Sequence, residues 1–324
     1  MLKPIPHTVV LGAGGTLACL FSAGAIPGLE LLGRPGQFRS IWVCSGSGPP
    51  GFLWGGGKSP RWIISKMLEY DFERMLPKVN SWYTVSKAVL KSQWTGEPLR
   101  TGVRDSAPLG YRIAKHVPEW PLCVKTLATC GNNEIVFTAE GVWEYGPNQD
   151  RRVISNEAAP VELGVRATAT VPMHMIPVEF HGRVLTDGAL NRHSRCPTTI
   201  ATIHDGTQVE DIIGLVPAKG DSQQSRWLMN IGRHLAHNSQ PELTQKAAII
   251  VKPVTEKIRT LDFSIPRARK ETAVLAGFHS MISGLNDIDF VSKRDVEKLV
   301  AKTQTIDGLL EWLDQREYSE SACI

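Results

Sequence analysis

Residues 7–27 read HTVVLGAGGTLACLFSAGAIP and decide the expected fold of this chain. Thr8–Leu11 is a short run of β-branched and aliphatic residues, which is typical of a buried strand. Gly12, Gly14 and Gly15 follow it, and apolar and small residues fill the rest of the stretch. The stretch therefore predicts a strand, a glycine loop and a helix in succession.

A second unit of the same kind lies thirty residues on. Ser40–Val43 reads as a short apolar strand, and every residue of Cys44–Gly48 (CSGSG) is small. Pro49 and Pro50 suit the first turn of a helix. A turn of small residues between a strand and a helix is the geometry of a nucleophile elbow, although a plain Gly/Ser turn has the same composition.

The third segment, Gly182–Asn191, reads GRVLTDGALN. Asp187 ends an apolar strand, Arg183–Asp187, and a glycine follows it. This pattern predicts a carboxylate at the carboxyl edge of a sheet, where open α/β folds bind ligands. A solvent-facing turn is the ordinary alternative for an Asp-Gly pair.

The remaining chain alternates strands with helices, which predicts a three-layer α/β/α fold with a mainly parallel central sheet. Thr8–Leu11 and Ser40–Val43 are expected to be neighbouring parallel strands at its centre. We expect a domain at residues 1–290 and a helical extension with a polar tail at residues 291–324. Further strands are predicted at Pro121–Thr129, Asn133–Thr138, Asp211–Val216 and Ala247–Val251, and helices at Arg226–His237, Arg267–Leu285 and Ser292–Trp312.

Composition narrows the functional classes. Lys and Arg number 36 and Asp and Glu 32, giving a formal charge of +4; the basic residues are spread out, so no nucleic-acid footprint is expected. The amino terminus matches neither a signal peptide nor a membrane span, which predicts a cytoplasmic protein. The six cysteines form no CxxC pair, so we expect free thiols.

No cofactor or metal is expected. A dinucleotide fingerprint needs a third glycine where Leu17 stands. His234 and His237 lie three apart on a predicted helix, but no third metal ligand is evident. His193 follows Asp187 by six residues, and a structural role is its default reading.

In order along the chain, the glycine loop, the small-residue elbow and Asp187-Gly-Ala together resemble the patatin-like phospholipase family, over roughly residues 8–285. The resemblance implies a patatin-like fold and a Ser-Asp dyad without histidine, in which Asp187 is the base. It also implies an oxyanion hole at Gly12, Gly14 and Gly15. An aspartate can act as such a base only if desolvation raises its pKa towards the working pH.

Two departures from the family pattern matter. Thr16, Leu17 and Ala18 stand after the glycines, where the family usually carries an arginine or lysine. The family's Gly-x-Ser-x-Gly is also not intact, which leaves three registers open at the elbow.

We expect Ser47 to be the nucleophile, because glycines flank it on both sides. Ser45 is the alternative, but it places Val43, which looks too large, two residues before the nucleophile. Centring the elbow on Gly46 gives the best steric agreement and removes the nucleophile altogether.

The function expected from the resemblance is that of a lipid acyl hydrolase or acyltransferase acting on phospholipid or lysophospholipid, with peripheral contact to a membrane. The alternative is a patatin-like pseudoenzyme that binds lipid or a protein partner without turnover. Phe52, Leu53, Trp54 and Trp62 suggest a lipid-facing rim, unless the helix that carries them is buried behind the nucleophile.

Overall fold

The computed structural model describes residues 6–190, 197–216, 249–251 and 261–321. The helix predicted at Arg226–His237, with His234 and His237, lies outside the described residues, and so does His193. The strands are β1 (Thr8–Leu11), β2 (Ser40–Val43), β3 (Gly102–Arg104), β4 (Val124–Cys130), β5 (Asn133–Thr138), β6 (Gly141–Tyr145), β7 (Arg151–Ser155), β8 (Met173–Met175), β9 (Val178–Phe180), β10 (Arg183–Asp187), β11 (Ile212–Leu215) and β12 (Ile249–Val251). The helices are α1 (Gly15–Leu29), α2 (Gly48–Gly55), α3 (Pro60–Glu69), α4 (Phe72–Met75), α5 (Trp82–Thr95), α6 (Ala107–His116), α7 (Val161–Thr168), α8 (Pro197–Asp205), α10 (Arg267–Asp287), α11 (Lys293–Lys302) and α12 (Ile306–Ser321).

The sheet confirms the predicted fold class. Its strands run in the order β12-β11-β1-β2-β4-β5-β6-β7, and the first five of these are parallel to their neighbours. β1 and β2 are adjacent, parallel and central, as expected, with Thr8 opposite Ser40. Beyond β4 the sheet continues antiparallel, because the tight turn after β4 returns the chain as a hairpin.

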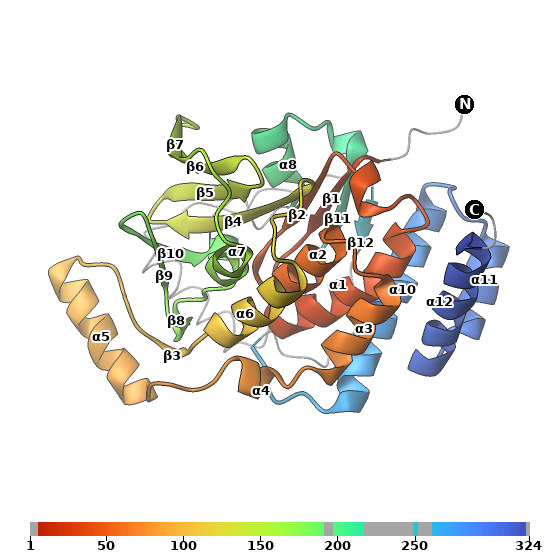
Figure 1. The fold of residues 1–324 in the computed structure, drawn as a ribbon, viewed down its shortest axis with the longest axis horizontal. Helices are drawn as coiled ribbons and strands as arrows, with labels where there is room; N and C mark the ends of the chain where they lie inside the picture. The colour runs from red at the N-terminus through yellow and green to blue at the C-terminus, as the bar shows by residue number, and fades with distance from the viewer. Residues whose placement is uncertain (1–5, 191–196, 217–248, 252–260, 322–324) are drawn as a thin grey trace.

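Helices cover both faces of this sheet (Figure 1). Successive side chains of a strand point to opposite faces. Val9 and Leu11 accordingly belong to the large core beneath α1, α2 and α10, while Val10 packs in a second cluster with Ile200 of α8. The chain therefore has the three layers that the sequence predicts.

α1 is the most deeply buried helix, since every residue after Gly15 is buried. Its backbone lies in close contact with the backbone of α10. A Cβ at Gly24 would lie 1.8 Å from the carbonyl oxygen of Val274, and one at Gly277 would lie 2.1 Å from that of Phe21. Glycine is required at both positions for the two helices to approach so closely.

The carboxyl-terminal helices pack on α10, where the ring of Trp312 lies 5.2 Å from that of Phe278. The predicted helix at Ser292–Trp312 is two helices, with α11 ending at Lys302 and α12 beginning at Ile306. The division at residue 290 stays a prediction.

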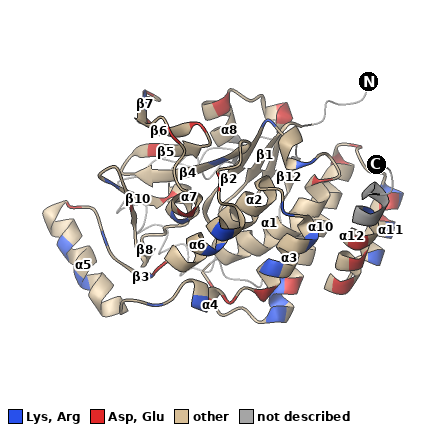
Figure 2. Ribbon diagram, in the orientation of Figure 1, with Lys and Arg blue, Asp and Glu red and all other residues tan. Residues whose placement is uncertain are grey.

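Lys and Arg are spread over many elements, with Asp and Glu among them (Figure 2).

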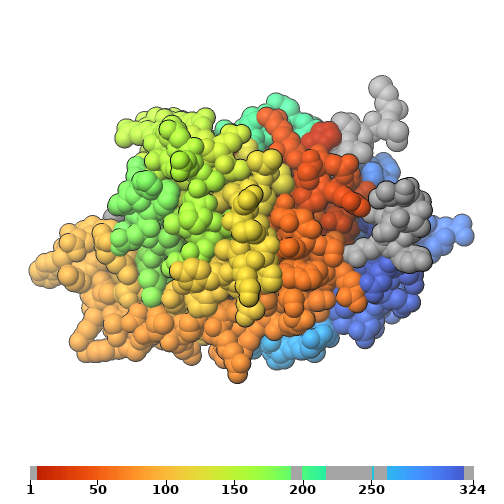
Figure 3. All heavy atoms as spheres, viewed as in Figure 1, coloured from red at the N-terminus to blue at the C-terminus, as the bar shows by residue number. Residues whose placement is uncertain are grey.

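α5 lies apart from the helices that cover the sheet. It projects from one end of the molecule, opposite the end that carries α11 and α12 (Figures 1 and 3). Among the described helices, none combines the length and the apolar character that crossing a membrane requires.

Candidate active site

The turn after β2 places Ser45 at its apex. Ser45 follows Cys44, the cap of a short 3₁₀ turn, and α2 begins three residues later at Gly48. Its φ of 56° lies in the left-handed region, which is uncommon for a residue with a side chain. The backbone N–H of Ser45 donates to Thr168 Oγ1 at 2.9 Å, which helps to hold this conformation. A strained residue between a strand and a helix is the signature of a nucleophile elbow.

Ser45 points at Asp187. Its Oγ donates a hydrogen bond of 2.7 Å to Asp187 Oδ2, and Oδ1 of the same carboxyl accepts the N–H of Ala189 at 2.7 Å. Asp187 ends β10, which pairs antiparallel with β4 beside β2. The predicted position of Asp187 at the edge of the sheet is therefore observed.

Burial tunes the carboxyl of Asp187. Its side chain is fully buried, and desolvation raises its pKa from 3.8 to about 7, although the hydrogen bonds from Ser45 and Ala189 favour the charged form. A base with a pKa near neutrality accepts and returns a proton efficiently. The carboxyl has the property that a histidine-free dyad requires.

Ser47, the expected nucleophile, makes no hydrogen bond to Asp187, whereas Ser45 does. The Ser47 hydroxyl lies 2.6 Å from the Leu11 carbonyl oxygen and 2.8 Å from that of Cys44, and it accepts the N–H of Cys44 at 3.0 Å. It is fully buried below the turn, where it ties β1 to the elbow. Gly46 is not at the apex either.

The packing around Val43 is compatible with Ser45 at the apex of the turn. Val43 looked too large for its position, but Gly51 of α2 leaves room for it. A Cβ at Gly51 would lie only 2.2 Å from Val43 Cγ1. The space that a glycine in the strand would normally provide is supplied by a glycine in the following helix.

The glycine loop meets the elbow through Gly46. A Cβ at Gly46 would lie 1.8 Å from the carbonyl oxygen of Gly15, so only glycine fits directly after Ser45. Gly14 caps α1, and Gly15 begins it with a φ of 56°. The first N–H groups of a helix lack partners within it, which leaves donors at this junction. Gly12 lies further back, and its N–H donates to Leu215 in the sheet.

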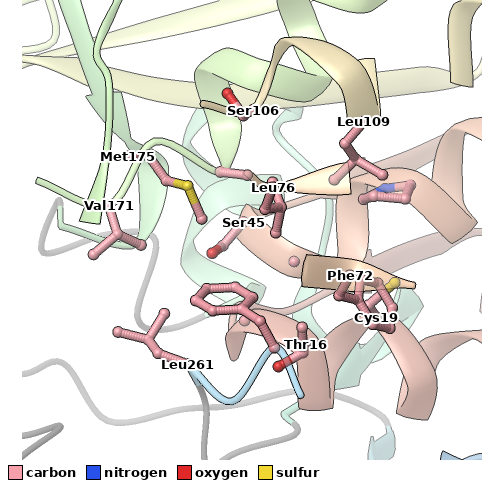
Figure 4. Close-up of a pocket in the computed structure, with 15 residues that line it drawn as sticks. Thr16, Cys19, Ser45, Phe72, Leu76, Ser106, Leu109, Val171, Met175 and Leu261 are labelled. Carbon is pink, nitrogen blue, oxygen red and sulfur yellow. The ribbon is translucent and has the colours of Figure 1, made fainter. Parts of the chain in front are cut away.

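Beside Ser45 lies an apolar pocket whose empty space, including the part open to solvent, is about 490 Å³ (Figure 4). Gly15, Ser45 and Gly46 lie on one side of it. Its other lining residues are Thr16, Cys19, Pro49, Phe72, Leu76, Ser106, Leu109, Ala169, Val171, Met175, Leu261 and Phe263. The pocket suits an acyl chain in its walls and an ester at Ser45.

Three contacts hold the pocket walls together. Thr16 Oγ1 donates to the Asp262 carbonyl oxygen at 2.6 Å, which fixes the segment with Leu261 and Phe263 against α1. Arg104, which is buried, donates to the Leu76 carbonyl oxygen at 2.5 Å and lies 4.5 Å above the ring of Phe263. Sequence reasoning missed Arg104, because its partners Leu76 and Phe263 lie far from it in the sequence.

Of the two alternatives for the helix after the elbow, the structure shows the buried one. Phe52, Leu53 and Trp54 are fully buried, and Trp62 packs at the edge of the core. Cys19, Cys44, Cys123 and Cys130 are free thiols as expected. Within the described ranges, no group of three His, Cys, Asp or Glu side chains is placed to hold a metal ion.

Comparisons with known proteins add a distant likeness. No model of a known protein family matches the sequence, and no curated protein matches it. The chain is similar to the solved structure of VipD from Legionella pneumophila, with 11% identity and a TM-score of 0.37, over 88% of this chain and 67% of VipD. It is also similar to human GIVD cytosolic phospholipase A2, solved with methyl gamma-linolenyl fluorophosphonate, with 10% identity and a TM-score of 0.46. That likeness covers 91% of this chain and 60% of the phospholipase.

Proposed function

We propose that this chain is a patatin-like lipid acyl hydrolase that uses Ser45 as nucleophile and Asp187 as base. The observation that carries the proposal is the 2.7 Å hydrogen bond from Ser45 Oγ to the buried carboxyl, made at a strained elbow beside an apolar pocket. Nucleophile and base within hydrogen-bond reach are the minimum that covalent acyl transfer needs.

The chemistry follows from the positions of these groups. Ser45 Oγ attacks the ester carbonyl carbon of a phospholipid or lysophospholipid while Asp187 takes its proton. The oxyanion forms near Gly15 and Gly46, and we propose that their N–H groups are its donors. This pair replaces the expected set of Gly12, Gly14 and Gly15. Collapse expels the alcohol, which takes the proton from Asp187 and leaves an acyl-Ser45. Water, activated by Asp187, releases the fatty acid, and another alcohol in its place would make the enzyme an acyltransferase.

Labelling with a fluorophosphonate probe tests the nucleophile. We expect the folded wild-type protein to be modified on the peptide that contains Ser45, and Ser45→Ala to abolish the labelling. Ser47→Ala should retain it. Ser106→Ala is the matched control, since Ser106 lines the same pocket and its hydroxyl makes no hydrogen bond within the described part of the chain.

Two outcomes contradict the proposal. Modification at Ser47 or Ser106 instead of Ser45 would place the nucleophile elsewhere. A folded protein that is never labelled would favour the pseudoenzyme, which binds lipid or a protein partner in the same pocket. Localisation in the cytoplasm stays a prediction.

A further inference from the structure

The outward face of α5 has no role in the core or in the pocket. Val85 is its only buried side chain. Val85 packs with Leu99, Val103 and Met173, which fixes the helix to β3 and β8. Ala88 and Val89 pack half-buried against the same cluster, and the opposite side of α5 faces outward at one end of the molecule (Figure 3).

Large apolar side chains form a stripe on this free face. Tyr83 is 68% exposed, Leu90 67% and Trp94 92%. Spacings of seven and four residues place the three side chains on one side of a helix. Trp82, at the start of α5, is also 46% exposed. We call Tyr83, Leu90 and Trp94 the α5 stripe.

The charge around the stripe is positive. Lys87 and Lys91 lie between its members, and the Lys87 ammonium lies 4.4 Å from the centre of the Tyr83 ring. Glu97 is the single acidic residue in the sequence between Lys78 and Arg100. Figure 2 shows basic segments along α5. Trp, Tyr and Leu beside lysines are typical of helices that lie in the interface of an anionic membrane.

The beginning of α5 is linked to residues that line the pocket. The ring of Trp82 contacts that of His174 at 5.0 Å between centroids. His174 stands between Met173, which packs under α5, and Met175, which lines the pocket. Leu76, another pocket residue, precedes α5 by only a few residues. A surface bound through α5 would therefore be attached to the protein through the same segments that carry Leu76 and Met175 of the pocket.

We infer that the α5 stripe docks this protein on an anionic phospholipid surface. The inference rests on the proposed function, because docking on a phospholipid surface would supply the lipid on which the Ser45 site acts. Positive charge favours a membrane of opposite charge over a second copy of the same positively charged face. Each lysine near such a surface strengthens binding by about fivefold.

The test measures partition onto vesicles of phosphatidylcholine with and without phosphatidylglycerol. The variant Tyr83→Gln/Leu90→Gln/Trp94→Gln keeps helix-forming residues and should bind anionic vesicles at least about tenfold more weakly. Val153→Thr/Phe290→Gln removes exposed apolar side chains elsewhere and should bind like wild type.

Charge and catalysis are separated in further arms. Lys87→Gln/Lys91→Gln should weaken binding to vesicles that contain phosphatidylglycerol. It should leave binding to vesicles of phosphatidylcholine only unchanged. The triple variant should keep wild-type hydrolysis of a water-soluble short-chain ester and lose hydrolysis of vesicle lipid. Ser45→Ala should bind vesicles normally and hydrolyse neither substrate.

Wild-type protein that does not partition onto anionic vesicles, or a triple variant that binds as wild type does, overturns the inference. A wild-type dimer that the triple variant dissociates, without vesicle binding, would identify a second copy as the occupant. Vesicle binding through α5 by a protein that hydrolyses no ester would uphold the docking surface and reject the proposed function.

Discussion

Replacing Asp187 with asparagine should stabilise the folded chain at neutral and alkaline pH. Burial raises the pKa of this carboxyl from 3.8 to about 7, so between these values the folded state holds a proton that the unfolded chain has released. Stability therefore falls as pH rises through this window. At about 1.36 kcal/mol per pKa unit, the full cost of ionisation is on the order of 4 kcal/mol. Asparagine avoids it, and its amide can still accept from Ala189 and donate to Ser45.

Urea unfolding of both proteins at about pH 4 and about pH 8 measures this difference. The gain in unfolding free energy should be small at the lower pH and several kcal/mol at the higher one. Asp287→Asn, on an exposed position of α10, is the control and should show no such gain. Equal pH dependence in wild type and Asp187→Asn would refute a buried, neutral carboxyl.

The same carboxyl sets the direction of the pH profile. Because only the ionised form of Asp187 accepts the Ser45 proton, kcat/KM for a short-chain ester should rise with pH and level off above about 7. Asp187→Asn should lower the rate by on the order of 10²–10⁴-fold. A flat profile, or unchanged turnover in the variant, would end the dyad proposal.

Three further predictions concern the elbow. Gly46→Ala should abolish labelling and destabilise the fold, because its Cβ would lie 1.8 Å from a carbonyl oxygen of the glycine loop; Gly36→Ala, with open space around it, should do neither. Gly51→Ala should be destabilising alone and partly rescued by Val43→Ala, with a coupling of about 0.5–3 kcal/mol in a double-mutant cycle; simple additivity would contradict the steric explanation. Ser47→Ala should lower the unfolding free energy by about 1–3 kcal/mol while keeping the fluorophosphonate reaction, and loss of that reaction in a folded protein would restore the original register.

Local patterns were enough to predict the framework of the site. β1, β2 and the glycine loop follow from short apolar runs that end at glycines, and such runs need no knowledge of distant residues. Asp187 was predicted at the sheet edge for the same reason.

The register of the elbow could not be read from the turn alone. It depends on Gly51 making room for Val43 and on Gly15 lying against Gly46, and both contacts form only after helices pack. The pocket walls are equally nonlocal, since Phe263 reaches the site through Arg104 and Thr16. Such contacts cannot be predicted from the periodicity of side chains within one segment.

The contact between α1 and α10 can form only late in the synthesis of the chain. α1 is buried along almost its whole length, yet the helix that covers it begins about 240 residues later. At a synthesis rate of roughly 5–20 residues per second, α1 waits on the order of 10–50 s on the ribosome before α10 exists. During that time an apolar helix with a glycine groove is open to aggregation and to chaperones. Chains cut short before α10 should therefore accumulate as insoluble protein, whatever remains intact at Ser45.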